Sequence, residues 1–275
     1  MDIPVFHDDQ HGTAIICLAG FINACHLTGR KVEDTRIVMS GAGAAAIATI
    51  NLLHKYGVQK KNIVMCDTHG VIFKGRRWMN IWKEEFATDR PERTLEEALV
   101  GADCFIGVSV ADALKEESVK LMGKSPIIFA MANPNPEITP EAARRACPDA
   151  IIATGRSDYP NQINNVMCFP FLFRGTLDVR SREINAEMKM ATALALAKLA
   201  REPVPQSVKD AYKGENRSFE FGPDYIVPTP FDPRLITTIP PVVAKAAMDS
   251  GVAKRPILDW DLYRLQLLAR VGRDE

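Results

Sequence analysis

The chain has 275 residues, of which 47% are hydrophobic, and its 34 basic residues balance its 34 acidic residues. This length and composition allow one or two domains with a sizeable core. Zero net charge provides no electrostatic reason to bind nucleic acid or an anionic membrane surface, so we expect neither partner.

The six cysteines form no C-x-x-C pair, and most lie within apolar runs. We therefore expect free, buried thiols in a reducing compartment, which favours a cytoplasmic protein. The sequence does not open with a basic region followed by an apolar core, so no signal peptide is expected. The longest apolar stretch, residues 13–25, contains Asn23 and is too short to span a bilayer.

The first predicted elements are an extended segment, residues 1–10, and a largely buried helix, residues 11–27. Asp8 or Asp9 stands where the N-cap of this helix would be, and Gly29 ends it.

A strand, a glycine-rich turn and a helix then follow in immediate succession. Residues 37–40 are typical of a buried strand and residues 45–56 of a helix. The turn between them fits the dinucleotide pattern G-x-G-x-x-G/A, which requires this context. Its first glycine permits a tight turn, and its second lets the backbone approach a pyrophosphate. The alternative is a turn that serves packing alone. We assign the cofactor contacts of the turn to Gly41, Ala42, Gly43, Ala44 and Ala45.

A second strand, predicted at residues 62–67, ends in Asp67. This acid lies about 26 positions after Gly41, near the spacing of the carboxylate that binds the adenosine ribose. Such an acid favours NAD, but three nearby basic residues could instead serve the 2′-phosphate of NADP, so both cofactors stay open. These residues are Lys74, Arg76 and Arg77.

Further strands and helices alternate after a polar loop at residues 68–91. The strands are predicted at 103–109, 126–132 and 150–154, and the helices at 94–100, 116–121 and 139–146. Thr94 and Thr139 are suitable N-caps. This alternation predicts an α/β fold, a Rossmann-like doubly wound parallel sheet with flanking helices.

The pattern becomes helical from residue 164 onward. A helix broken by Pro170, a long helix capped by Ser181 and a third helix are predicted, followed by a charged amphipathic helix that could face a partner. Their ranges are 164–177, 181–201, 235–251 and 259–275, with a proline-rich loop at 203–233. We divide the chain into a first segment and helix (1–35), a nucleotide-binding domain (36–180) and a helical C-terminal extension (181–275).

Several polar residues stand where a ligand would bind. Asp8 and Asp9 lie between histidines at a helix start, which fits either a helix cap or a site for Mg²⁺ or Mn²⁺ that needs further ligands. Ligands of open α/β sheets bind outside the carboxyl ends of strands. Ser109 ends a predicted strand, and Asn133, Asn164 and Asn165 follow predicted strands. Each asparagine alone is also typical of a turn or a cap.

Four segments together resemble the malic enzyme family, in particular its bacterial branch. They are residues 4–14 (PVFHDDQHGTA), 40–45 (SGAGAA), 129–134 (FAMANP) and 164–166 (NNV). They occur in the family's order and extend over most of the chain.

The resemblance implies oxidative decarboxylation of malate to pyruvate with NAD or NADP and a divalent metal, Mg²⁺ or Mn²⁺. It implies that Asp9 is a direct metal ligand, and that Asp8 is a catalytic residue that orients the family's lysine. It also implies that Asn133, with Asn164 or Asn165, holds malate. Ser109 and Asn133 are expected to face the cofactor as well.

Family members carry a preceding domain with a tyrosine acid, a lysine base, a substrate arginine and a Glu-Asp pair that completes the metal site. None of these can be located here, so we expect a fragment or a split-gene product that requires a separate N-terminal catalytic domain. Ile3, Val5 and Phe6 would then be exposed, which favours a homo-oligomer. The rival interpretations are another NAD(P)-dependent oxidoreductase, such as an amino-acid dehydrogenase, and a non-catalytic nucleotide-binding fragment.

Overall fold

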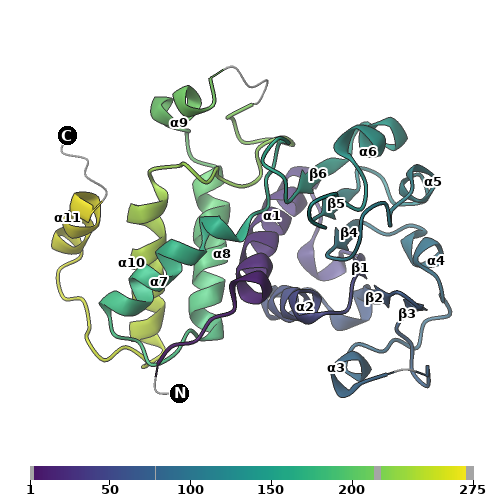
Figure 1. Ribbon diagram of the computed structural model, residues 1–275, viewed down its shortest axis with the longest axis horizontal. Coiled ribbons are helices and arrows are strands. Elements are labelled where there is room, and N and C mark those ends of the chain that lie inside the picture. The colour runs from purple at the N-terminus through teal and green to yellow at the C-terminus, as the bar shows by residue number, and fades with distance from the viewer. Residues whose placement is uncertain (1–2, 78, 214–217, 271–275) are drawn as a thin grey trace.

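A six-stranded sheet with helices on both faces forms one half of the molecule (Figure 1), and the computed structural model describes residues 3–77, 79–213 and 218–270. The strand order is β3-β2-β1-β4-β5-β6, with β3 antiparallel to β2 and all other neighbours parallel. The predicted Rossmann-like α/β fold is therefore confirmed, although β3 lies in a region predicted as loop. The strands are β1 (Ile37–Ser40), β2 (Ile63–Asp67), β3 (Gly70–Val71), β4 (Cys104–Gly107), β5 (Ile127–Ala130) and β6 (Ile151–Thr154).

Helices surround this sheet and continue beyond it. Figure 1 shows α7, α8 and α10 on the far side of α1 from the strands. The helices are α1 (Thr13–Thr28), α2 (Ala44–Tyr56), α3 (Ile81–Glu84), α4 (Leu95–Leu99), α5 (Glu116–Val119), α6 (Pro140–Ala146), α7 (Phe169–Asp178), α8 (Ala186–Ala200), α9 (Gln206–Ala211), α10 (Leu235–Asp249) and α11 (Trp260–Arg270). A π-helical turn, η1 (Asp8–Gly12), precedes α1, and three 3-10 turns are η2 (Val32–Asp34), η3 (Lys60–Asn62) and η4 (Asn165–Met167).

Alternate side chains of the parallel strands enter two separate cores. Met39 and Phe129 belong to the larger core, which includes α1 and α2. Phe105 and Ile128 belong to the smaller core, which includes residues of α4, α5 and α6. Burial on both faces explains why these strands are continuous apolar runs rather than alternating ones.

Several locally encoded helix ends are confirmed. Thr94 forms a capping box with Glu97 at the start of α4, and the Thr139 side chain accepts a hydrogen bond from the first turn of α6. Gly29 ends α1 in the left-handed conformation, with φ 66°. Pro170 lies in the first turn of α7, just after η4, so the predicted break in this helix is also confirmed.

Three predictions about the helices are wrong. Ser181 caps no helix, because its hydroxyl donates to the Glu183 carbonyl (2.7 Å), and α8 begins later with Asn185 as its cap. Asp8 and Asp9 cap no helix either, because both lie inside η1, which follows His7 without a side-chain cap. Helix α9 forms within the predicted loop 203–233, where Val208 supplies a buried anchor.

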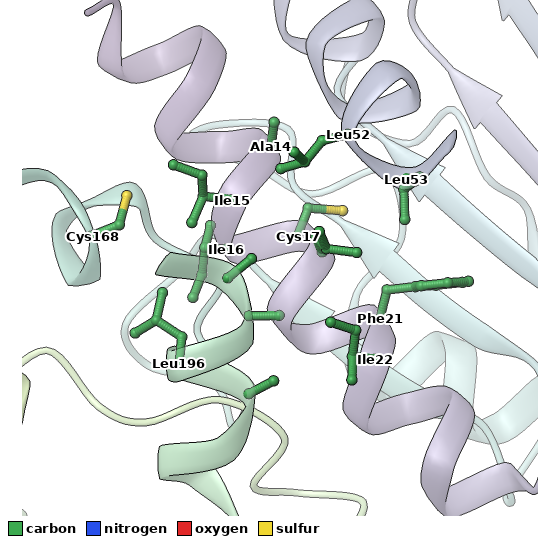
Figure 2. Close-up of a cluster of buried hydrophobic side chains, with 14 of the residues drawn as sticks. Ala14, Ile15, Ile16, Cys17, Phe21, Ile22, Leu52, Leu53, Cys168 and Leu196 are labelled. Atoms are coloured by element: carbon green, nitrogen blue, oxygen red, sulfur yellow. The ribbon is translucent and has the colours of Figure 1, made fainter. Parts of the chain in front are cut away.

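Helix α1 is the most deeply buried helix in the described part of the chain. Figure 2 shows its apolar side chains packed against Leu52 and Leu53 of α2 and Leu196 of α8. The helical run Asp8–Thr28 is longer than the predicted apolar stretch and has the length and composition of a membrane span, but most of it is buried within the fold.

One polar side chain, Asn23, is fully buried on α1. Its amide nitrogen donates to the carbonyls of Ala197 (2.9 Å) and Ile226 (2.7 Å), and its oxygen accepts from Arg201 (2.7 Å). A buried amide that satisfies both groups adds specificity to the docking of α1 against α8.

The predicted exposure of apolar residues near the start is confirmed at two positions. Ile3 and Val5 are 61% and 64% exposed. Phe6 was expected to be exposed as well, but it packs edge-on against Phe173, with 5.9 Å between the two ring centroids. All six cysteines are free and five are buried, as predicted.

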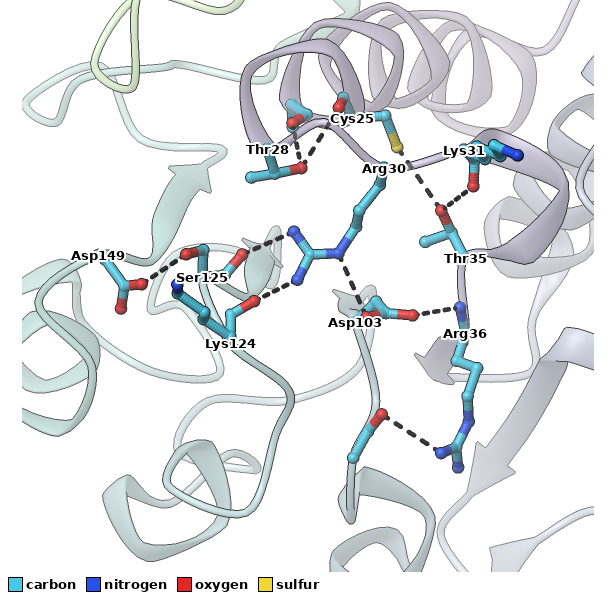
Figure 3. A network of polar contacts seen from close by, with 12 residues as sticks. Cys25, Thr28, Arg30, Lys31, Thr35, Arg36, Asp103, Lys124, Ser125 and Asp149 are labelled. Carbon is cyan, nitrogen blue, oxygen red and sulfur yellow. Dashed lines mark hydrogen bonds and ion pairs between the residues drawn. The ribbon is translucent and has the colours of Figure 1, made fainter.

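A polar network joins the end of α1 to the starts of β1 and β4 (Figure 3). Arg30 donates to the Asp103 carboxylate (3.2 Å) and to the Ser125 carbonyl (3.0 Å), and the other oxygen of Asp103 accepts from the backbone N–H of Arg36 (2.9 Å). Asp103 therefore links the segment that follows α1 to the segment that precedes β1, at the amino end of the sheet.

We expect Asp103→Ala to lower the free energy of unfolding by about 2 kcal/mol, because it leaves the partly buried Arg30 guanidinium without its acidic partner and the Arg36 N–H without its acceptor. Urea unfolding would measure the loss. Asp34→Ala, which removes an exposed acid, is the control and should change stability by less than about 0.5 kcal/mol. Equal effects of the two substitutions would contradict the role of the network.

Candidate functional site

The glycine-rich turn has the geometry that its pattern predicted. Gly41 has φ 117°, and a Cβ there would lie 2.7 Å from the Val108 carbonyl oxygen. The Gly41 N–H donates to the Cys66 carbonyl (2.9 Å), and the Val108 N–H donates to the Ser40 carbonyl (2.9 Å). The turn is thus tied to β2 on one side and to the end of β4 on the other, and only glycine fits.

Gly43 differs from Gly41, because open space surrounds it. A Cβ built on Gly43 meets no heavy atom within 4 Å. Gly43 is the N-cap residue of α2 and no side chain caps that helix, so the first N–H groups of α2 have no side-chain acceptor. Ala46 is fully buried where α2 lies on the sheet. This arrangement suits a phosphate at the start of α2.

A groove of about 610 Å³ runs from this turn along α2, with residues of η1, α1 and α8 on its other side. Ala42, Gly43 and Ala44 line one end of it, and His11 and Lys189 lie beside them. Burial, followed by the charge of Lys189, lowers the pKa of His11 to about 4, so its ring is neutral at pH 7. Lys189 has no acidic partner among the residues that the structure describes. Its cation is therefore available to an anionic ligand.

Asp67 stands at the end of β2, as predicted, but its carboxylate is already paired. Arg76 donates to both of its oxygens (2.9 and 2.6 Å), and Lys83 donates to one (2.6 Å). The His69 N–H adds a fourth hydrogen bond (2.9 Å). Burial alone would raise the pKa of Asp67, but these donors outweigh it and hold the pKa well below its usual range. Its predicted role at the ribose stays a prediction, and Lys83 was not foreseen.

Ser109 lies just beyond β4 in a second polar cluster. Its hydroxyl is 3.0 Å from the Ser40 hydroxyl at the end of β1. Its N–H and its hydroxyl both lie within hydrogen-bonding distance of the buried carboxylate of Glu137, at 2.8 and 3.0 Å. Asn133 is exposed just after β5, at a cis Asn133–Pro134 bond. Ser109 and Asn133 thus lie at the predicted edge of the sheet.

Asp8 and Asn165 meet although 157 positions separate them. The Asn165 amide donates to Asp8 Oδ2, while Asp8 Oδ1 is buried without any partner. Burial raises the pKa of Asp8. A Cβ on Gly12 would overlap Asp8 Oδ1 and crowd Asn165, so this glycine permits the contact. Asn164 instead caps its own turn by accepting from the Val166 N–H (2.9 Å).

Asp9 is exposed, and the described residues contain no group of three His, Cys, Asp or Glu side chains able to hold a metal ion. The donor set of residues 3–77, 79–213 and 218–270 therefore does not close a cation site alone. The unpartnered oxygen of Asp8 is the only buried carboxylate oxygen in this part of the chain that lacks a hydrogen bond.

Sequence reasoning missed Glu137, Lys83 and Lys189. Each forms its environment with residues distant along the chain, so no short motif marked it. The proline-rich segment around Glu137 and the basic residues of the stretch predicted as a loop, residues 68–91, were the signals in the sequence; Lys83 lies in α3 within that stretch.

A family model described as "Malic enzyme, NAD binding domain" matches residues 10–209. The chain is 59% identical over 271 residues to the NADP-dependent malic enzyme of Rhizobium meliloti, covering 98% of this chain and 35% of that protein. It is 53% identical over 264 residues to the NAD-dependent malic enzyme of the same organism, with 96% and 34% covered. The chain thus spans about a third of the length of these relatives.

Solved structures agree with these sequence matches. The Entamoeba histolytica malic enzyme superposes with a TM-score of 0.87 at 35% identity, covering 99% of this chain and 55% of that one. The malic enzyme of Pyrococcus horikoshii gives a TM-score of 0.82 at 33% identity, with 99% and 61% covered.

We expect Gly43→Val to abolish dinucleotide binding while the fold survives, because its side chain enters only the open space that a pyrophosphate would occupy. Titration calorimetry with NAD and NADP would measure binding, and thermal unfolding would measure stability. Gly41→Ala is the comparison and should destabilise the fold by about 1 kcal/mol or more, because φ is positive and the Val108 carbonyl is close. Undiminished binding by Gly43→Val would refute the phosphate site.

Proposed function

Because the chain belongs to the malic enzyme family, through that family's NAD-binding domain, we propose that it supplies the cofactor half of an enzyme that converts malate to pyruvate and CO₂. The observation that carries this proposal is a shared groove. Ala42, Gly43 and Ala44 of the glycine turn and Gln10 and His11 of η1 line it. Asp8 and Asp9 are not among the lining residues, but they belong to the same π-helical turn as Gln10 and His11, and this turn connects the proposed metal ligand to the proposed phosphate site.

In this proposal the start of α2 and Lys189 bind the phosphates of NAD(P), and neutral His11 offers a hydrogen bond beside them. The bound dinucleotide supplies the hydride acceptor for oxidation at C2 of malate. Asn133, Asn164 and Asn165 hold the substrate through their amides. Asn165 already donates one N–H to Asp8, which fixes its orientation and leaves its oxygen and second N–H for a ligand.

We propose Asp9 as one ligand of Mg²⁺ or Mn²⁺, with the remaining ligands outside the described residues. Its exposed carboxylate is the type of oxygen that these ions prefer, but one carboxylate holds them weakly. Asp8 is proposed to orient the site through Asn165 rather than to bind the ion. The described residues therefore do not close a metal site by themselves.

NADP is the cofactor that we favour. Arg76 and Lys83 both pair with Asp67, so two cations surround one acid and the end of β2 is positively charged overall, which suits a 2′-phosphate better than a free hydroxyl. In this arrangement Asp67 acts by holding the two cations in place. The same surface accommodates NAD without the gain from the extra phosphate.

We further propose self-association through apolar surface that includes Ile3 and Val5, and a cytoplasmic location. The first is supported by the exposure of these side chains, and the second by six unpaired cysteines.

We expect Lys83→Gln to weaken NADP binding about tenfold and NAD binding less than about twofold, because it removes a cation from the 2′-phosphate region. Paired calorimetric titrations would show this difference. Lys74→Gln, whose exposed lysine pairs with Asp89 instead, is the matched control and should leave both affinities unchanged. Equal losses for the two cofactors after Lys83→Gln would show that the lysine only supports the loop.

We expect the 275-residue chain to bind NAD(P) but not to oxidise malate, because neither the family's lysine and tyrosine nor a closed metal site can be located in it. Supplying the preceding domain of a family member, fused or separate, should produce NAD(P)H from malate with Mn²⁺. In that reconstituted enzyme, Asp9→Asn should raise the Mn²⁺ requirement, whereas Asp8→Asn should mainly alter the rate and the pH profile. Malate oxidation by the chain alone would contradict this division of the site.

A further inference from the structure

A fully buried carboxylate, Glu137, lies at the edge of the sheet that faces the proposed cofactor. Its Oε1 accepts from the N–H of Ser109 (2.8 Å) and lies 3.0 Å from the Ser109 hydroxyl, while its Oε2 accepts from the N–H of Ala132 (3.0 Å). No lysine, arginine or histidine pairs with it among the residues that the structure describes. Within this part of the chain, the buried acid is thus stabilised by hydrogen bonds from neutral groups and has no countercharge.

The fold is shaped around this side chain. A Cβ on Gly107, the last residue of β4, would overlap the Glu137 carboxyl group. The Glu137 backbone carbonyl also accepts from the N–H of Leu114 (3.0 Å), which fixes the residue from its other side. Glycine at position 107 therefore admits the carboxylate to a place between two strand ends.

The carboxylate connects three strand ends. Ser109 follows β4, Ala132 follows β5, and the hydroxyl of Ser109 continues the network to Ser40 at the end of β1. Ala132 directly precedes Asn133, so the bond to its N–H helps to set the position of that amide. Loss of the carboxylate would leave two backbone N–H groups without their acceptor.

The location of Glu137 also decides which half of a dinucleotide it would influence. In this proposal Asp67 and its cations mark the adenosine side at β2, and the other half of the cofactor would lie across β1 toward β4 and β5. The oxidised nicotinamide ring carries a positive charge, and the reduced ring is neutral. A fixed negative charge in a water-poor site acts over a longer distance than it would in water.

We propose that Glu137 is a positioning residue of the nicotinamide half of the site. Its carboxylate holds Ser109 and the backbone before Asn133, and its uncompensated charge favours binding of the oxidised over the reduced dinucleotide. This role rests on the proposed binding of NAD(P) at the glycine turn. It makes the reduced product easier to release than an uncharged edge would.

The test compares the affinities of NADP⁺ and NADPH for the 275-residue chain, by calorimetry and by NADPH fluorescence. Glu137→Gln removes the charge and should weaken NADP⁺ about fivefold more than NADPH. Glu137→Asp keeps the charge but shortens the side chain, so it should weaken both forms to a similar extent and preserve their ratio. Glu141→Gln, on the exposed side of α6, is the matched control and should change neither affinity.

A ratio of the two affinities that is unchanged in Glu137→Gln would overturn the electrostatic role. Undiminished affinity in Glu137→Asp would overturn the positioning role, and this second variant stays informative if the first does not fold by circular dichroism. If the unmodified chain binds neither form, the proposed cofactor site itself is refuted and this role falls with it. Binding by the unmodified chain with no effect of either Glu137 variant refutes only the role of Glu137.

Discussion

The burial of α1 is the constraint on which the rest of the structure depends. This helix lies between the sheet with α2 and the C-terminal helices with α8, and its apolar side chains contact both (Figure 2). Because η1 runs directly into α1, the position of α1 also sets the position of Asp8. The Asp8–Asn165 contact then joins η1 to η4, and Gly12 is small enough to permit this contact. A helix that belongs to the core thus also places the acids.

The carboxyl edge of the sheet contains two acids in opposite environments. Asp67 at the end of β2 is paired with two cations, and its surroundings are cationic overall. Glu137, between the ends of β4 and β5, has only neutral hydrogen-bond partners among the described residues. Removing an acid from water is unfavourable, and ion pairing and dipoles are the two ways in which a protein offsets this. The edge is therefore positive at one end and negative at the other, which matches the proposed NADP, with a 2′-phosphate at its adenosine end and a cationic nicotinamide ring at the other.

The groove beside α2 gives the proposed cofactor site its second wall. Lys189 comes from α8, well outside the part of the chain that forms the sheet, and it lies beside the glycine turn because α8 packs against α1. The helical C-terminal part therefore contributes to the proposed site and also covers the core.

Local sequence determined the elements whose causes are local. The apolar runs of β1 and β6, the capping threonines Thr94 and Thr139 and the glycine turn each act through neighbours a few residues away, so their predictions are confirmed. The predicted cap at Ser181 is wrong because its hydroxyl donates to the nearby Glu183 carbonyl instead. The structure also contains α9 within the stretch that its prolines predicted to be a loop.

Tertiary structure alone decided the environment of each charged group. The sequence showed Asp67 at a strand end, but Arg76 and Lys83 reach its carboxylate only after the loop beyond β2 has folded back. It showed acids near residue 8 and asparagines near residue 165, but only the docking of α1 brought Asp8 and Asn165 together. Glu137 had no visible role in the sequence, because its donors at Ser109 and its cavity at Gly107 lie on other elements. Periodicity and caps are properties of adjacent residues, whereas burial and hydrogen bonding of a side chain depend on segments that meet only in the folded chain.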